Sequence, residues 1–251
     1  MTKTPKISIV TIVYNDVKHL ETTIQSVVGQ DYFNIEYIII DGGSTDGSVD
    51  LIRKYSQKIQ HWISEPDKGI YDAMNKGLKA ANGDYILFLN SGDKLYHAQL
   101  FNQLFSDFGD DWPDVIYGET MIVAEDGSEI GLRRLKAPET LTWKSLKNGM
   151  LVCHQSFIAS TNIVPAYNLK YRLSADYEWM LKTLKAAKST QNCQQIIAGF
   201  LDGGTSKKNI QASLKERFNI MVQHYGFFQT LVKHLEIGAK FWVYFIKNKR
   251  F

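Results

Sequence analysis

The sequence predicts an α/β fold with a mostly parallel sheet flanked by helices, and three observations indicate it. Short apolar runs alternate with helical patterns over residues 7–95, as in sheets built from strand–helix–strand units. Each run is short enough to be a strand that is covered on both faces. Polar, turn-rich segments follow the runs, and in open parallel sheets ligands bind beyond the carboxyl ends of the strands. We therefore expect one α/β domain with a ligand site at that edge.

The first two predicted strands enclose one helix. ISIVTIV (7–13) is expected to be a strand, and Asp16 is the expected N-cap of the helix that follows it. YIII (37–40) is the second strand, and DGGSTDGS (41–48) is a turn-rich loop that opens onto the helical VDLIRKY. The inner face of the first helix is expected to carry Val17, Leu20, Ile24, Val27 and Val28.

The next predicted elements repeat this alternation. HWIS (61–64) is the third strand, GIYDAMNKGLKAA (69–81) is a helix, and YILFL (85–89) is the fourth strand. The strand-like runs around Asp126-Gly127, within residues 115–135, predict a hairpin. Ser174 is expected to cap a later helix and to place Asp176 in its first turn.

The charge distribution separates a tail from the main fold. The chain of 251 residues has a net charge of +3, but from Thr205 onward it carries nine Lys or Arg and two Glu. We expect a domain over residues 1–206 and a basic, amphipathic helical appendage over 207–251. A nucleic-acid binder should carry its basic surface on the main fold, so no nucleic-acid partner is expected. Two cysteines and the absence of a long apolar run favour a cytoplasmic protein that does not span a membrane.

Three acidic residues recur just beyond predicted strands. Asp41 follows YIII, Asp67 follows HWIS, and Asp93 follows YILFL. Acids gathered at one sheet edge repel one another unless they hold a cation or accept hydrogen bonds from a ligand. A metal-bound nucleotide diphosphate would satisfy both needs. The glycine patterns of a dinucleotide Rossmann site and of a Walker loop are absent from the sequence.

Taken in order, the motifs resemble one enzyme family. IVTIVYN, IIIDGGSTDGS, EPDKGIYDAMNKGLKAANGDYILFLNSGD and SADYEWML are similar to the family 2 glycosyltransferases, in particular the bacterial branch that builds capsules, exopolysaccharides and O-antigens. The similarity covers roughly residues 7–95 and 150–206. It implies the GT-A fold, a nucleotide-diphospho-sugar donor and an inverting transfer.

The resemblance also implies roles for individual residues. Tyr14 is expected to stack near the nucleobase, Asp41 to accept from the base or ribose, and Asp67 to lie beside the nucleoside. Asp93 lies in the metal and diphosphate motif, and Asp176 matches the acid that deprotonates the acceptor hydroxyl.

Two departures from the family pattern bear on the donor site. Many relatives read Asp-Ser-Asp-Asp where this chain reads Asn90-Ser91-Gly92-Asp93, so one carboxylate remains. Many carry Arg before Asn where this chain has Met74 before Asn75, and Asn75 is expected to contact the donor. Mg²⁺ or Mn²⁺ remains the expected cofactor, because one carboxylate together with donor phosphates and water can hold such an ion.

Four features leave alternatives open. His154 is a rival base, an acceptor contact or a core residue, and Glu178 is an acceptor contact or part of a solvated face. Residues 203–206 form a loop over the diphosphate or an ordinary turn. In the tail, Lys233, Lys240 and Lys247 recur on a different face from Phe228, Leu235 and Trp242. Such a helix lies at a membrane surface, packs on the core or forms a dimer.

The expected function is therefore an inverting sugar transfer from a nucleotide sugar to a hydroxyl of a saccharide acceptor, in surface polysaccharide biosynthesis. The acceptor is expected to be lipid-linked, and the enzyme to work in the cytoplasm at the inner face of the plasma membrane. One rival is a non-catalytic sugar-nucleotide-binding protein, which the reduced NSGD motif favours. The other is a sugar-1-phosphate nucleotidyltransferase, which needs a Gly-rich loop where the chain has Tyr14-Asn15.

Overall fold

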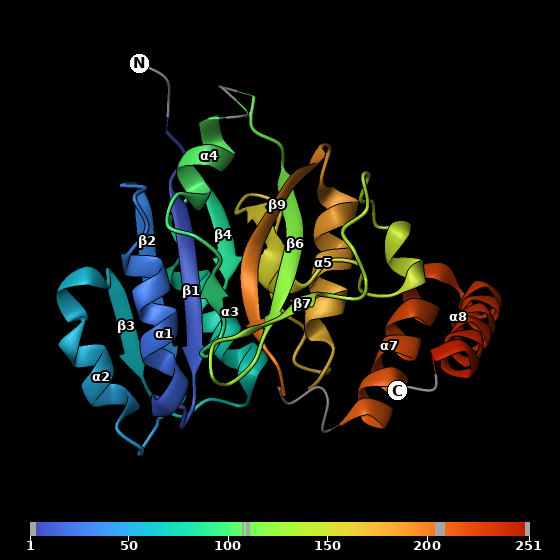
Figure 1. The fold of residues 1–251 in the computed structure, drawn as a ribbon, viewed down its shortest axis with the longest axis horizontal. Helices are drawn as coiled ribbons and strands as arrows, with labels where there is room; N and C mark the ends of the chain where they lie inside the picture. The colour runs from blue at the N-terminus through green and yellow to red at the C-terminus, as the bar shows by residue number, and fades with distance from the viewer. Residues whose placement is uncertain (1–3, 107, 109–110, 204–208, 249–251) are drawn as a thin grey trace.

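The computed structural model describes residues 4–106, 108, 111–203 and 209–248, with side chains up to residue 238. These residues form a mixed sheet flanked by helices (Figure 1). The described strands run in the order β3-β2-β1-β4-β8-β6-β9-β5, and β7 pairs with β6. The strands are β1 Ile7–Val13, β2 Ile35–Asp41, β3 His61–Ser64, β4 Tyr85–Phe88, β5 Lys94–Leu95, β6 Val115–Val123, β7 Glu129–Leu132, β8 Phe157–Ser160 and β9 Thr190–Leu201.

Helices connect these strands and cover both faces of the sheet (Figure 1). The α-helices are α1 Val17–Val28, α2 Ser48–Lys54, α3 Ile70–Ala80, α4 Leu100–Ser106, α5 Ala175–Ala186, α7 Ile210–Tyr225 and α8 Phe227–Asn248. Among the described residues, the short 3₁₀ helices are η1 Ser56–Lys58, η2 Ser145–Asn148 and η3 His154–Ser156.

The amino-terminal half has the predicted parallel arrangement. β1 pairs in parallel with β2 and β4, and β2 pairs in parallel with β3. The carboxyl ends of these strands therefore meet at one edge, the lower edge in Figure 1. The order runs outward from β1 in both directions, so the turns after β1 and β4 lie side by side where a ligand can enter.

The carboxyl-terminal half makes the sheet mixed. β8 runs antiparallel to β4, and β6 runs antiparallel to β8. The predicted hairpin is confirmed: β6 and β7 pair antiparallel around a turn in which Gly127 has a φ of +85°. The mostly parallel sheet expected from the sequence therefore describes residues 7–88, and the later strands add both antiparallel pairs and the parallel pair of β6 with β9.

The buried side chains divide into two layers, one on each face of the sheet. Alternate β1 residues point to opposite faces, as the two-residue period of a strand requires. Ile9 joins a cluster with Leu20 and Ile24 of α1, and Val10 joins a cluster with Met74 of α3 and Trp179 of α5. Met74, which stands where many relatives carry arginine, is thus a core residue.

Asp16 and Ser174 occupy the N-cap positions of α1 and α5, and Asp176 lies in the first turn of α5, as predicted. Neither N-cap residue makes a side-chain cap bond, however. The Asp16 carboxylate instead accepts from Ser91 Oγ and contacts His19 Nδ1, and Asp46 Oδ2 accepts the Val17 N–H. Capping residues were predicted from local sequence alone, whereas here partners that are distant in the chain fill that role.

The C-terminal region forms two helices separated by Gly226, which has a φ of +85°. Ile220, Met221 and Tyr225 of α7 belong to the same buried cluster as Trp179, so α7 packs against the main body. α8 lies at the outer edge of the molecule beside α7 (Figure 1). Among the described residues, no helix has the length and apolarity to cross a bilayer.

Candidate functional site

The loop after β2 is organised by the Asp41 carboxylate, which is fully buried. Its Oδ2 accepts the N–H groups of Gly43 and Ser44 and the hydroxyl of Ser64, at 2.6–3.0 Å. Its Oδ1 is also buried and has no hydrogen-bond partner among the described residues. A buried carboxylate oxygen without a donor is costly, so Asp41 has one acceptor left for a ligand N–H or hydroxyl.

A second tie joins this loop to the end of β1. Asn15 has a φ of +49°, an uncommon conformation for a residue with a Cβ. Its N–H donates to Ser44 Oγ, and its Oδ1 accepts the Thr45 N–H. These bonds hold the turns after β1 and β2 against each other and fix the position of Tyr14.

Tyr14, Asp41 and Asp67 come together around Gly42, as expected. Tyr14 is 65% exposed. A Cβ built on Gly42 would lie 2.5 Å from Asp67 Oδ2 and 3.2 Å from Tyr14 Cδ2. The glycine therefore lets an open aromatic ring and a carboxylate approach the same stretch of backbone. A flat ring with polar edge groups, such as a nucleobase, fits this surface.

The turn after β4 holds Asp93 in the interior. Asp93 is 4% exposed, its Oδ1 accepts the Leu201 N–H at 3.0 Å, and its Oδ2 accepts Gln155 Nε2 at 2.7 Å. Burial raises its pKa to about 6, although both of these bonds and the charge of His154 act in the opposite direction. Asp93 thus connects the NSGD turn to β9 and to η3.

The fit of a divalent cation depends on the oxygens near this turn. Among the described residues, no three His, Cys, Asp or Glu side chains gather as a metal site. Asn90 Oδ1 is buried and lacks a partner among the described residues, and a carbonyl oxygen is a ligand that Mg²⁺ and Mn²⁺ accept. Asn90, with Asp93 three residues later in the same turn, fits a cation that draws its other ligands from phosphate and water, and it does not fit a cation held by protein alone.

η3 connects the two predicted catalytic regions. His154 Nδ1 lies 3.6 Å from Asp176 Oδ2 on α5, and His154 Nε2 lies 3.4 Å from Asn90 Nδ2. The neighbouring Gln155 holds Asp93. One turn of 3₁₀ helix therefore places a histidine between the predicted base and the end of β4, and it supplies the residue that binds the predicted metal ligand.

The surroundings of Asp176 keep its carboxylate ionised. Its Oδ1 accepts the Tyr71 hydroxyl at 3.1 Å and the Tyr177 N–H at 2.8 Å. Burial alone would raise its pKa, but the interactions with His154 and the charge of Arg217 outweigh burial, so the pKa of Asp176 is lowered. The side chain remains 14% exposed, and an ionised carboxylate in this position can accept a proton.

Two other predicted site residues make contacts away from this centre. The Asn75 side chain forms two hydrogen bonds with the Tyr167 main chain, at 2.7 and 2.9 Å. Tyr167 stacks on Tyr71, so Asn75 positions the aromatic residues behind Asp176. Glu178 is 3% exposed, and its ion-pair partners are Lys182 on α5 and His224 on α7. It is not part of a solvated face.

Gln155 and Asn90 are the site residues that the sequence did not single out for a role. Both stand in segments that were recognised, CHQSF and NSGD. Their importance comes from contacts between residues 62 and 64 positions apart in the chain, which local patterns do not reveal. Of the loop at 203–206, residues 204–206 lie outside the described part of the chain.

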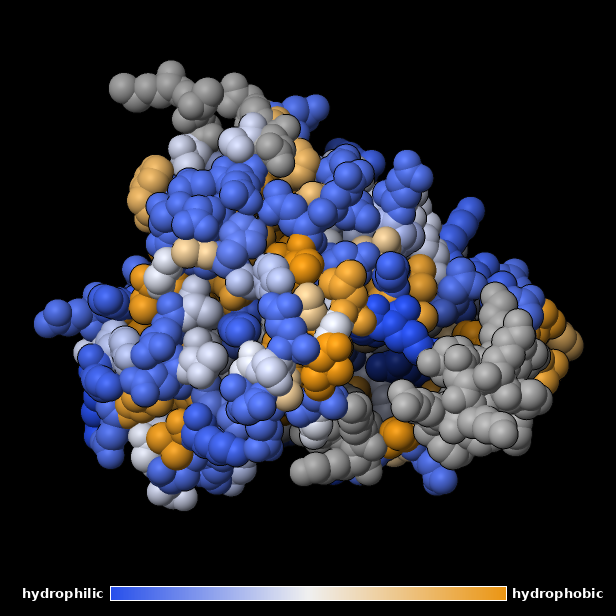
Figure 2. All heavy atoms as spheres, viewed as in Figure 1, coloured by the Kyte–Doolittle hydropathy of each residue, from blue (hydrophilic) through white to orange (hydrophobic). Residues whose placement is uncertain are grey.

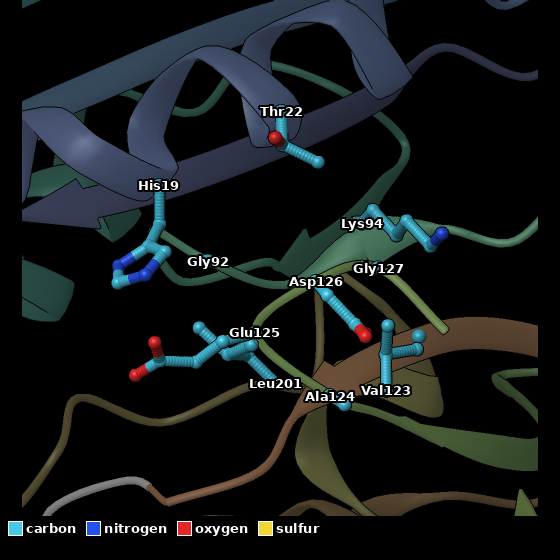
Figure 3. A pocket seen from close by; sticks show the side chains of 11 residues that line it. His19, Thr22, Gly92, Lys94, Val123, Ala124, Glu125, Asp126, Gly127 and Leu201 are labelled. Carbon is cyan, nitrogen blue, oxygen red and sulfur yellow. The ribbon is translucent and has the colours of Figure 1, made fainter. Parts of the chain in front are cut away.

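A pocket of about 170 Å³ adjoins the NSGD turn on its other side. It lies between α1, the turn from β6 to β7, and β9. In Figure 3 the His19 ring and the Glu125 carboxylate lie on the same side of this pocket. Gly92 lines it, but Asp176, His154 and Asp93 do not. The pocket is therefore separate from the cluster around Asp176.

Comparison with known proteins places this geometry in a family. Residues 8–162 match the family described as glycosyl transferase family 2. TuaG of Bacillus subtilis (strain 168), a glycosyltransferase assigned to teichuronic acid biosynthesis, is 33% identical over 202 residues, which cover 78% of this chain and 79% of TuaG.

Solved structures show the same fold at low sequence identity. TarS 1–349 of S. aureus superposes with a TM-score of 0.68 at 17% identity, covering 94% of this chain and 73% of that one. The mannosyltransferase PcManGT of Pyrobaculum calidifontis, solved with GDP-Man and Mn²⁺, has a TM-score of 0.59 at 11% identity and covers 95% and 76%. The fold predicted from the sequence is thereby confirmed, and the chain belongs to glycosyl transferase family 2.

Proposed function

We propose that this glycosyltransferase moves a sugar, with inversion, from a nucleotide-diphospho-sugar to a hydroxyl of a saccharide acceptor. The observation that carries the proposal is the position of Asp176. It is an ionised carboxylate, 3.6 Å from His154, and His154 in turn reaches Asn90 at the ligand edge of the parallel strands. The Tyr14–Gly42–Asp67 surface lies at the same edge and suits the nucleoside.

In this mechanism each group has one task. Tyr14 stacks on the base, and Asp41 Oδ1 and Asp67 accept hydrogen bonds from the base or ribose. Asp176 accepts the proton of the acceptor hydroxyl as that oxygen attacks the anomeric carbon on the face opposite the leaving group. Tyr71 and the Tyr177 N–H hold the carboxylate in place. A single attack of this kind inverts the anomeric configuration.

A divalent cation, Mg²⁺ or Mn²⁺, belongs to the proposal as the cofactor. Asn90 Oδ1 and Asp93 are the residues that would hold it. When bound, such an ion neutralises charge on the departing nucleoside diphosphate. The structure of PcManGT with GDP-Man and Mn²⁺ supports this part of the proposal.

The acceptor and its location follow from the relatives and from α8. The biosynthetic role assigned to TuaG supports surface polysaccharide synthesis, and a lipid-linked saccharide is the acceptor we propose. The exposed apolar residues of α8 and its neighbouring lysines support contact with the inner face of the plasma membrane from the cytoplasm.

Replacing Asp176 tests whether the chain is an enzyme and which group is its base. Asp176→Asn keeps the size of the side chain but cannot accept the proton. We expect sugar transfer to fall by about 10²- to 10⁴-fold. Donor binding, measured by calorimetry, should persist because the nucleoside contacts lie at the other end of the site. Near wild-type transfer by this variant would remove Asp176 from the role of base.

His154→Gln is the matched control, because the His154 and Asp176 side chains contact each other. With Asp176 as base, its own titration adds no rise above pH 5.5, since its lowered pKa lies below that range. Any rise near pH 6 should then persist in His154→Gln, because the pKa of Asp93 is about 6. With His154 as base, His154→Gln should instead lose most of the transfer at every pH. A pH profile of the wild type together with the two variants distinguishes these assignments.

A further inference from the structure

Two arginines that make no ion pair with another described residue lie beside the proposed catalytic centre. Arg133 follows β7, and its Nη1 contacts the main-chain oxygens of Leu151 at 3.3 Å and Leu135 at 3.5 Å. Arg217 belongs to α7, and its Nη2 lies 4.0 Å from Met150 Sδ. Both are partly buried. Neither makes an ion pair within 4.0 Å with any residue in the described ranges.

The segment that leads into η3 brings the two side chains together. One guanidinium contacts Leu151 and the other contacts Met150, three and four residues before His154. Each arginine is close enough to influence the other and Asp176 electrostatically, and burial together with the charge of Arg217 lowers the pKa of Arg133. Figure 2 shows strongly hydrophilic residues gathered between the sheet and the C-terminal helices.

The arrangement leaves hydrogen-bonding capacity unused. Arg217 Nε is buried and has no partner among the residues the structure describes. Arginine keeps its charge when it is buried, so among the described residues two such groups near the one carboxylate of Asp176 leave an excess of positive charge. Burying cations in this way is unfavourable unless an anion binds there.

We propose that Arg133 and Arg217 form a binding site for a diphosphate group next to Asp176. Planar guanidinium groups match the geometry of phosphate oxygens, and two of them suit a group that carries more than one negative charge. The inference rests on the proposed function, whose nucleotide donor and lipid-linked acceptor both contain a diphosphate. That diphosphate belongs either to the nucleotide donor or to a lipid-linked acceptor.

The test compares diphosphates with monophosphates on the full-length chain. For the donor source, calorimetry measures UDP against UMP and GDP against GMP. For the acceptor source, it measures farnesyl diphosphate against farnesyl monophosphate. The variants are Arg133→Met, Arg217→Met and the charge-preserving Arg133→Lys and Arg217→Lys. Arg53→Met is the control, because Arg53 lies near the end of α2 and is paired with Asp50 on the surface.

We expect wild type to prefer the diphosphate of one pair. Each methionine variant should weaken binding of that diphosphate by about 10- to 100-fold, since hydrogen bonds to charged groups are lost. The affinity for the monophosphate should change little. The lysine variants should retain part of the preference, which shows that loss is not caused by misfolding. Arg53→Met should behave as wild type. The pair of ligands that is affected identifies the source of the diphosphate.

Two results would contradict the inference in distinguishable ways. In the first, wild type prefers nucleoside diphosphates, and the arginine variants keep the wild-type preference both among the nucleotides and among the farnesyl phosphates. This result would overturn the arginine site and leave the proposed function intact. A wild type that binds no nucleotide would overturn the proposed function. The arginine site would then be tested by the farnesyl phosphates alone. Equal affinity for farnesyl diphosphate and farnesyl monophosphate would overturn it as well.

Discussion

Asp93 shows how one side chain can serve the fold and the site together. Its carboxylate accepts from Leu201 on β9 and from Gln155 on η3, while the turn that carries it also presents Asn90 to His154. A carboxylate that is buried with two neutral donors is costly to ionise. The geometry of the NSGD turn therefore depends on the protonation state of Asp93.

The pH dependence of stability should report this group. The pKa of Asp93 is raised from 3.8 to about 6, chiefly by burial, so the folded chain holds this proton more tightly than the unfolded chain. Its stabilising contribution is present below about pH 4 and is lost as the pH rises through 6. Raising the pKa from 3.8 to about 6 corresponds to about 3 kcal/mol of free energy.

Asp93→Asn removes the titration. We expect the free energy of unfolding of wild type, relative to this variant, to fall by about 2.5 kcal/mol between pH 4 and pH 7. Urea unfolding at several pH values measures it. Parallel pH profiles of the two proteins would mean that Asp93 does not titrate in this range.

At the scale of elements, α7 holds the start of α5 in place. Glu216 of α7 accepts the N–H groups of Arg172, Leu173 and Ser174, each at 2.9 Å. These residues immediately precede α5, whose first turn carries Asp176. Ser174 is the N-cap of α5, and its N–H is one of those that a helix end leaves without an intrahelical partner. Here a carboxylate from another helix accepts it together with the two N–H groups before it.

Removing this carboxylate should loosen the proposed base. Glu216→Ala leaves three N–H groups to find water, and we expect a loss of about 2–3 kcal/mol of stability with a lower transfer rate. Glu216→Gln keeps one acceptor, so its stability and transfer rate should lie between those of wild type and Glu216→Ala. Glu125→Gln, in an exposed pair with Lys18, is the control and should leave the unfolding midpoint unchanged. Equal midpoints for all variants would rule out the proposed role of Glu216.

The strands and the strand-end acids were predictable because they are encoded in short, periodic segments. The limits of β1 and β3 agree with the expected residues, and Tyr14, Asp41 and Asp67 meet at Gly42 as parallel strands require. Contacts between distant segments were not predictable in this way. Gln155 with Asp93, and Glu216 with Ser174, join elements whose approach depends on packing of the whole chain.

At the scale of the whole molecule, α8 carries an exposed apolar row. Phe228, Val232 and Leu235 are 82%, 54% and 66% exposed, and they recur at the helical spacing i, i+4, i+7. Lys147 and Lys233 line a hollow of about 310 Å³ with Phe228 and Val232. The side chains of Lys240, Trp242 and Lys247, which belong to the same prediction, lie outside the described part of the chain.

This row predicts binding to anionic membranes. Each large apolar side chain that leaves water contributes about 1.5–3 kcal/mol, and each nearby lysine about 1 kcal/mol that salt screens. The double variant Phe228→Glu with Leu235→Glu should therefore lose binding to vesicles that contain phosphatidylglycerol. Wild-type binding should weaken as salt is raised from 50 to 500 mM and should be weaker on neutral vesicles, as cosedimentation can measure.

Phe33→Glu is the matched control, since Phe33 is 83% exposed but lies in the loop between α1 and β2. It should bind vesicles as wild type does, because a negative charge placed there does not face the membrane. Light scattering on the same proteins tests the alternative, in which the apolar row of α8 forms a dimer interface. If wild type never binds vesicles but forms a dimer that the α8 variant dissociates, the row is an interface between two copies of the chain, and the proposed membrane contact through α8 is wrong.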